Sequence, residues 1–312
     1  MKNKYCGYIA IIGRPNVGKS TLLNALLEKK LSITSSKPQT TRHRILGIKT
    51  IENAQLIFVD TPGLHAPKNQ FKLLNKQLNK TATLALKEAD VILWVIDAAR
   101  FTSEDELILE KLKKWREKNK KNSLSLFIVI NKIDNLKDQN SVLMTIDELS
   151  ALFQEYSISA EFVPISAQKK HNLKKLEKLI IKHLPESPFY FDEKTLTDRD
   201  DGFVASEMIR EKLIRFLGQE LPYATTVSIQ SIQPKTTVKQ KPILHISAII
   251  WVEKEGQKKI IIGENGKKLK QIGEQARLAL ENYFEKKIFL QLWVKVKSGW
   301  SENPLLLKKI LE

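Results

Sequence analysis

Short apolar runs alternate with amphipathic stretches along residues 1–184. The apolar runs are YIAIIG, QLIFVD, VILWVID, LFIVINKID and FVPIS, and the stretches between them place apolar residues at helical spacing. Short continuous runs in this alternation are typical of strands that are buried on both faces and separated by helices. The pattern therefore predicts an α/β domain with a mostly parallel sheet and helices on both faces.

The order of predicted elements changes in the last third of the chain. The stretch LPESPFYFDEKTLTDRDDG has two prolines, several acids and no clear period, which predicts a linker over residues 185–200. Beyond it the pattern predicts a helix, two strands, two helices and a final strand. We therefore expect an α/β domain over 1–184 and a small α+β domain over 201–312.

Composition narrows the class of protein. The hydrophobic content of 42% is ordinary for a globular protein, and no apolar run approaches the roughly 20 residues that span a bilayer. The single cysteine, Cys6, excludes an intrachain disulfide, so a reduced, cytoplasmic location is expected. The net charge of +17 favours a polyanionic partner, although a lysine-rich composition also suits a merely solvated surface.

The segment GRPNVGKS follows the first apolar run and opens the first amphipathic stretch. It matches the pattern GxxxxGK(S/T), in which backbone amides surround phosphate oxygens at a helix N-terminus. The lysine of this pattern reaches the β and γ phosphates, and the serine can hold Mg²⁺. The nucleotide-binding residues predicted in this loop are Gly13, Arg14, Pro15, Asn16, Val17, Gly18, Lys19, Ser20 and Thr21.

The segment DTPG follows the run QLIFV at the end of a predicted strand. Asp60 is therefore expected to face Mg²⁺ through water, and the amide of Gly63 is expected to meet the γ-phosphate. Thr61 and Pro62 complete this nucleotide-binding stretch. A plain turn is the alternative for so short a motif.

Two later segments point to the base. NKID follows LFIVI, and a carboxylate at Asp134 can accept both N1–H and N2–H₂ of guanine, which adenine does not offer. Asn131 and Lys132 belong to the same motif. Ser166 and Ala167, in PISA, supply the small polar loop expected beneath the base. The order of the four motifs predicts GTP as the nucleotide.

The segment QTTRHR, residues 39–44, predicts a switch loop in which a threonine hydroxyl completes the Mg²⁺ shell when γ-phosphate is present. Thr41 is favoured over Thr40, and an ordinary polar loop is the alternative. The predicted Mg²⁺ ligands are Ser20, Thr41 and Asp60.

One catalytic residue common in GTPases is missing. Ras-like GTPases place a water-orienting glutamine directly after the DxxG glycine, whereas this chain has Leu64 and then His65. Because leucine cannot orient water, we expect slow intrinsic hydrolysis, helped by a backbone-held water, a bound cation or a partner. His65 is a weaker alternative, since a loop histidine is more often solvated. The residues assigned to catalysis are Lys19, Thr41, Asp60 and Gly63.

A second glycine pair lies in IIGENGKKLKQIG, between two predicted helices. A second nucleotide site is disfavoured, because no GK(S/T) follows the loop and no buried parallel strand precedes it. Two interpretations remain, a clamp for the backbone of a nucleic acid and a plain turn between helices.

The motifs GRPNVGKS, QTTRHR, DTPG with a hydrophobic follower, and NKID resemble bacterial translation-factor-related GTPases that lack the catalytic glutamine. TDRDDGFVASEMIREKLIRFLGQELPY, VEKEGQKKIIIG and LQLWVKVKSGW narrow the resemblance to the Era family, from about Tyr5 to Trp300. The resemblance implies a type II KH domain that binds the 3′ end of small-subunit ribosomal RNA during late 30S assembly. It also implies peripheral association with the inner face of the cell membrane, and K⁺ binding at Asn16 that stimulates hydrolysis.

In a KH domain a GxxG loop clamps about four single-stranded nucleotides beside an apolar groove. Glu264 departs from an ideal clamp, because its repulsion must be outweighed by nearby lysines or avoided by an outward side chain. Trp293 and Trp300 could stack on bases, but core packing is favoured for both. Core packing is also favoured for residues 260–262, with one of the three lining the groove as the alternative. The expected RNA contacts are Gly263, Glu264, Asn265, Gly266, Lys267 and Lys268.

The expected function is a molecular switch that uses GTP, GDP, Mg²⁺ and, by resemblance, K⁺. GTP would order the loops around Thr41 and Gly63, favour RNA binding by the KH domain, and be hydrolysed on release from the maturing subunit. One rival is a GTPase that partners tRNA modification, which would need a catalytic cysteine or a cofactor domain. The other is a GTPase that uses its lysines on anionic membranes, with a dispensable GxxG loop.

Overall fold

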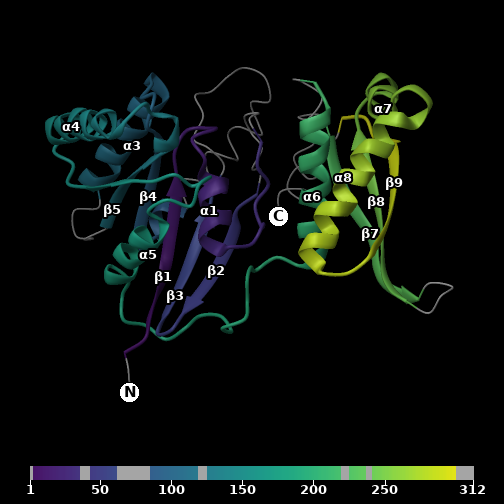
Figure 1. Cartoon of the computed structure of the whole chain (residues 1–312), viewed down its shortest axis with the longest axis horizontal. Coiled ribbons are helices and arrows are strands. Elements are labelled where there is room, and N and C mark those ends of the chain that lie inside the picture. Colours follow the sequence, from purple (N-terminus) through teal and green to yellow (C-terminus); the bar gives the residue numbers. More distant parts are fainter. Residues whose placement is uncertain are drawn as a thin grey trace. The chain divides into compact units, whose positions relative to one another are not determined.

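The computed structural model describes residues 3–35, 43–61, 85–118, 125–218, 225–236 and 241–299. Among these residues the chain divides into two units, one made of the described parts of 3–32 and 43–198, the other of 33–35 and the described parts of 199–299. Both units are seen in Figure 1. Residues 33–35 belong to the second unit, where Arg215 Nη2 donates to the carbonyl and hydroxyl oxygens of Thr34 at 3.2 and 3.3 Å.

The first unit is built on a six-stranded sheet in the order β2-β3-β1-β4-β5-β6. Its strands are β1 (Tyr5–Ile12), β2 (Ile45–Ile51), β3 (Ala54–Asp60), β4 (Val91–Asp97), β5 (Ser125–Asn131) and β6 (Glu161–Pro164). Only β2 is antiparallel to its neighbour, so the mostly parallel sheet is confirmed. The strand β2 was not predicted, because Gly47 and Lys49 interrupt its apolar run.

Helices cover both faces of this sheet, as expected for strands without a polar face. They are α1 (Lys19–Leu27), α3 (Ser103–Lys118), α4 (Gln139–Glu155) and α5 (Leu173–Lys182), with a short 3₁₀ turn, η1 (Ile133–Asn135). Ile108 and Phe153 pack with Trp94 and alternate residues of β4 and β5 on one face. The intervening residues, such as Leu93 and Val95, are also fully buried. The fold therefore places the carboxyl ends of β1, β3 and β5 at one edge, where the predicted motifs follow.

Residues 190–196, near the end of the first unit, are hydrogen-bonded to the strands of that unit. Ile48 N donates to Leu196 O at 2.8 Å, and Gln55 Nε2 donates to Phe191 O at 2.8 Å. The backbone amide of Tyr190 in turn donates to Gln55 Oε1 at 2.9 Å. These bonds hold residues 190–196 along the unit that contains β2 and β3.

The second unit has the predicted order of elements. They are α6 (Asp201–Phe216), β7 (Thr225–Thr236), β8 (Pro242–Val252), α7 (Glu255–Ile262), the 3₁₀ turn η3 (Glu264–Gly266), α8 (Lys267–Phe284) and β9 (Ile288–Val296). The sheet order is β7-β8-β9, with β7 antiparallel and β9 parallel to β8. Asp200 caps α6 by accepting from Phe203 N at 2.7 Å. In Figure 1, α6 and α8 lie along one face of this sheet.

Two expectations about apolar residues were wrong. Trp293 was expected to pack in the core, but 44% of it is exposed, because it stands on the outward side of the edge strand β9. Ile260 is 49% exposed, since the spacing in α7 turns only Ile261 fully inward. Among the described helices, none has the length and apolar character needed to cross a membrane.

Candidate nucleotide and RNA sites

The loop between β1 and α1 is shaped by two crowded glycines. Gly13 has φ 144° and Gly18 has φ 103°, values that side-chain-bearing residues rarely adopt. A Cβ atom at Gly13 would lie 2.4 Å from the carbonyl oxygen of Val95, and one at Gly18 would lie 2.3 Å from Asn131 Nδ2. The backbone of this loop can therefore take its course only with glycine at both positions.

Lys19 begins α1 and lies inside the loop. Its Nζ donates to the carbonyl oxygens of Gly13 at 2.9 Å and Arg14 at 2.8 Å. Burial lowers the pKa of Lys19 to about 8, although the negative charge of Asp60 acts in the opposite direction. The loop thus surrounds a buried amine that is held at the helix N-terminus, where a phosphate chain binds best.

Asp60 ends β3 and faces the same loop. Ser20 Oγ donates to Asp60 Oδ2 at 2.9 Å, and Oδ1 accepts no hydrogen bond from the described residues although it is buried. Burial raises the pKa of Asp60, while the charge of Lys19 opposes the shift. A hydroxyl and a carboxylate are hard oxygen ligands of the kind that Mg²⁺ prefers, so these two residues fit the ion.

Asn131 connects three of the predicted motifs. Its Nδ2 donates to Val17 O at 2.8 Å, and its Oδ1 accepts from Ala167 N at 2.9 Å. It is buried at the end of β5, beside Gly18. Because both ends of its amide are bonded to protein, Asn131 fixes the phosphate-binding loop and the PISA loop relative to NKID.

The other residues of the base site are more open. Asp134 is exposed, and its carboxylate has no hydrogen bond or ion pair within the described part of the chain. Lys132 Nζ donates to Asp97 Oδ2 at 2.7 Å. Ser166 is buried, and its Oγ accepts from Lys169 N at 3.0 Å. Asp134 is therefore available as the acceptor for a base.

Some predicted side chains are already bonded within the protein, through partners that sequence reasoning missed. Arg14 Nε donates to the fully buried Asp105 at 2.8 Å, and Thr61 Oγ1 donates to Ile11 O at 2.9 Å. Asp105 and Asp97 carry no motif, so only the fold reveals them. The predicted residues Thr41, Pro62 and Gly63 lie outside the described residues, as do Leu64, His65 and Trp300.

The second glycine pair separates α7 from α8. Gly263 has φ 70° and ψ 179°, and a Cβ there would lie 2.6 Å from the Cβ of Lys268. Gly266 has φ 75° and ψ 4°, and a Cβ there would meet nothing within 4 Å. Glu264 and Lys267 are exposed, in agreement with an outward acid side chain.

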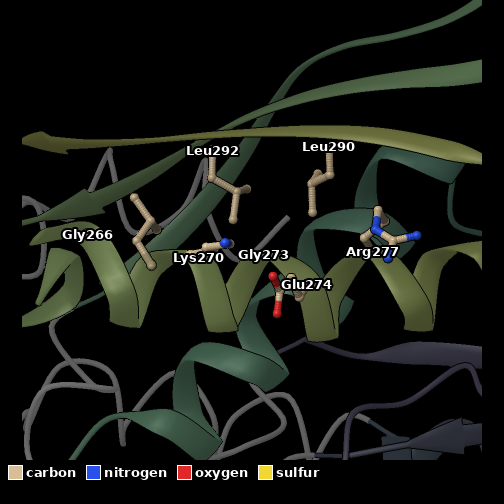
Figure 2. A pocket seen from close by; sticks show the side chains of 8 residues that line it. Gly266, Lys270, Gly273, Glu274, Arg277, Leu290 and Leu292 are labelled. Carbon is tan, nitrogen blue, oxygen red and sulfur yellow. The ribbon is translucent and has the colours of Figure 1, made fainter.

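A groove adjoins this loop. It has a volume of about 450 Å³ and lies between α8 and β9. Figure 2 shows Leu290 and Leu292 pointing from β9 toward α8, so the floor of the groove is apolar. The groove is lined by Gly266, Leu269, Lys270, Gly273, Glu274, Arg277, Leu290 and Leu292.

Fold and sites together define a P-loop GTPase domain followed by a KH domain. Comparisons of the chain with known proteins give the same class. Residues 8–132 match a family model described as a 50S ribosome-binding GTPase, and residues 220–301 match a KH domain model. GTPase Era of Coxiella burnetii is 48% identical over 99% of both chains. GTPase Era of Pseudomonas putida is 48% identical over 98% of this chain and 96% of the relative.

Solved structures lead to the same family. An Aquifex aeolicus Era variant bound to GDP and AlF₄⁻ has a TM-score of 0.87 and 41% identity, with 98% of each chain covered. A crystal structure of Era with MgGDPNP and nucleotides 1506–1542 of 16S ribosomal RNA gives the same TM-score, identity and coverage. The chain belongs to the Era family of GTPases, whose reaction is hydrolysis of GTP to GDP and phosphate.

Proposed function

We propose that this GTPase is a switch that binds the 3′ end of small-subunit ribosomal RNA and assists assembly of the 30S subunit. The observation that carries the proposal is a nucleotide loop closed around Lys19 in the same chain as a GxxG loop beside an apolar groove. The RNA in the solved Era complex supports the choice of RNA.

At the nucleotide site the protein binds GTP, orients it and neutralises the charge of its phosphates. Loop amides and Lys19 hold the phosphates, and Asp134 accepts from the guanine edge. Mg²⁺, held by Ser20 and Asp60, would neutralise charge on the β and γ phosphates when bound. Water attacks the γ-phosphorus and gives up a proton to solvent, the bond to the β–γ bridging oxygen breaks, and GDP and inorganic phosphate leave. Leu64 and His65, which follow the DxxG glycine, lie outside the described residues.

At the RNA site the open space above Gly266 admits a sugar-phosphate backbone. Bases would then lie along Leu290 and Leu292, with Lys267 and Lys270 near the phosphates. The exposed Glu264 can turn away from them. The clamp is proposed to take a single strand, as KH domains generally do.

The salt dependence of RNA affinity tests the proposal. Protein bound to a GTP analogue or to GDP is titrated with a short RNA that copies the 3′ end of small-subunit rRNA, alongside Gly266→Asp. We expect GTP-favoured binding, a log–log salt slope near 0.7 for each phosphate contacted, and loss of binding in the variant. An RNA affinity that is the same in both nucleotide states and is unchanged in Gly266→Asp would reject the clamp.

The proposal extends to K⁺ and to location. Asn16, in the nucleotide loop at φ 65°, is proposed to bind K⁺ and so to stimulate hydrolysis. Equal single-turnover rates in K⁺ and Na⁺ would remove this role. We also propose a cytoplasmic protein with peripheral membrane association, which cosedimentation with anionic vesicles tests directly.

A further inference from the structure

The sheet of the second unit has an outward face with its own chemistry. In the register of β8 and β9, His245 pairs with Phe289, Ser247 with Gln291, Ile249 with Trp293, and Trp251 with Lys295. Paired residues share a face, and the intervening pairs point toward α6 and α8. We call these eight residues the outer sheet face.

Two aromatic side chains stand out from this face. Phe289 is 45% exposed and Trp293 is 44% exposed, four positions apart on one strand, or roughly 13 Å. The His245 ring lies 4.8 Å from that of Phe289, tilted by 36°. Single exposed apolar residues are common, but two exposed aromatic rings on the same face of one strand, one of them beside a histidine ring, indicate a binding surface.

The charges around these rings suit a polyanion. None of the outward positions on the described strands β7, β8 and β9 is acidic, whereas Lys235 and Lys295 are cationic. Lys297 Nζ lies 5.9 Å from the centroid of Trp251, whose Nε1 donates to Ser228 Oγ at 2.8 Å. Exposed rings among cations are the usual platform for single-stranded nucleic acid.

Polar groups between the rings favour nucleic acid over lipid. Ser247 and Gln291 lie between the two exposed rings and are linked by a 3.4 Å hydrogen bond. A lipid-facing patch would be continuously apolar. Bases, by contrast, present hydrogen-bonding edges as well as flat faces.

We propose that the outer sheet face is a second site for single-stranded RNA, where bases that flank the clamped ones stack on Phe289 and Trp293. The inference rests on the proposed function. β9 is an edge strand, and its Leu290 and Leu292 line the groove on its other side, so RNA leaving the groove passes around one strand to reach the rings. One clamp holds about four nucleotides, fewer than the 1506–1542 segment bound to the solved relative.

Nested RNAs test this site. The affinity of the full chain bound to a GTP analogue is measured for about four clamped nucleotides and for RNAs lengthened at either end. Lengthening should tighten wild-type binding by about tenfold or more for each stacked base. A double variant, Phe289→Ser with Trp293→Ser, should bind the shortest RNA normally and lose that gain. Leu278→Ser changes a side chain that is 50% exposed on α8 and is the matched control. It should bind lengthened RNA as much more tightly as wild type does.

The outcomes separate this site from the clamp. If wild type binds the short RNA and the double variant gains as much affinity as wild type when the RNA is lengthened, the second site is overturned and the clamp stands. No binding of any RNA overturns both. Selective loss of binding to phosphatidylglycerol vesicles, with the RNA gain unchanged, would assign the face to a membrane. Loss of self-association in sedimentation, again with the gain unchanged, would assign it to a second copy of this chain.

Discussion

The nucleotide loop and the GxxG loop each contain a pair of glycines, the second followed by lysine, but they differ in how they are built. In the nucleotide loop, a Cβ atom at Gly13 would lie 2.4 Å from a backbone carbonyl, and one at Gly18 would lie 2.3 Å from the Asn131 amide. In the GxxG loop, Gly266 faces open space. The first loop has its shape imposed by surrounding protein, while the second keeps its surface clear for a ligand.

The same contrast recurs between neighbouring residues. Asn131 is buried with both ends of its amide bonded, whereas Asp134, three positions later, is exposed with a free carboxylate among the described residues. In the GxxG loop Gly263 is crowded by Lys268 and Gly266 is not. In these two pairs, the residue that is saturated by protein contacts supports the shape of the site, and the unsaturated one is open to the ligand.

The largest effect should follow from Gly13→Ala. The methyl group would meet the Val95 carbonyl at 2.4 Å, at a backbone conformation that disfavours any side chain. Strain of this kind costs on the order of 1–3 kcal/mol before the clash is added, so we expect a lower melting temperature and no measurable GDP binding. Calorimetry and a fluorescent GDP titration measure both. Binding within threefold of wild type would mean that the loop is not rigid.

Asp134→Asn should change selectivity without changing stability. Asparagine replaces one acceptor by a donor that faces the guanine donors, so GTP affinity should fall by about a hundredfold or more. Competition between GTP and ATP measures the selectivity that is lost.

The contrasting variant is Asn131→Ala. It leaves Val17 O and Ala167 N unpaired, and buried groups of this kind cost about 1–3 kcal/mol each. Its free energy of unfolding should therefore fall, and all nucleotides should weaken together. Unchanged stability in Asn131→Ala would contradict its assignment as a structural link.

Sequence patterns could predict the strands that are buried on both faces, because their runs are continuous. They could not predict β2, where Gly47 admits α1: a Cβ there would lie 2.7 Å from Leu27 and 2.8 Å from Leu23. A glycine needed for close helix packing looks the same in sequence as one in a turn. The prediction for Trp293 failed for a related reason, since composition does not show which face of a strand is left uncovered: Val294 on the same strand is buried.

Site residues with a motif were predictable, and their partners were not. Lys19, Asp60 and Asp134 occur at fixed offsets within known patterns. Asp105, which holds Arg14, lies 91 positions away and is chosen only by the fold. Long-range pairing of this kind leaves no local signal, so sequence shows which groups meet the ligand more readily than which groups hold them.

The two GxxG glycines should respond differently to asparagine, which tolerates the left-handed region. Gly266→Asn should fold normally, because its φ of 75° and ψ of 4° suit asparagine and the space is open, but RNA affinity should fall by about tenfold as the side chain meets the backbone. Gly263→Asn should be destabilised, because φ 70° with ψ 179° is a conformation left almost entirely to glycine. Thermal unfolding and RNA titration of both variants compare the two positions. Equal melting temperatures would contradict the distinction.

The smallest effect concerns the buried amine of the nucleotide loop. With its pKa lowered to about 8, Lys19 loses its proton in free protein above that pH, whereas bound phosphate would keep it charged. GDP affinity should therefore fall about threefold between pH 7.5 and 8.5, with proton uptake on binding. Stability has the opposite sign: the unfolded lysine holds its proton better, so the destabilising burial of charge is relieved as pH rises from about 8 toward 10.5.

Calorimetry in two buffers of different ionisation enthalpy measures the proton uptake directly. Lys19→Arg is the control, because arginine stays charged throughout this range while the nucleotide titrates identically. A pH slope that persists in Lys19→Arg would place the titrating group on the nucleotide or on another residue. A pH slope confined to wild type would show that enclosure by the nucleotide loop lowers the pKa of its lysine. The open GxxG loop has no such effect, because Lys267 is exposed to solvent.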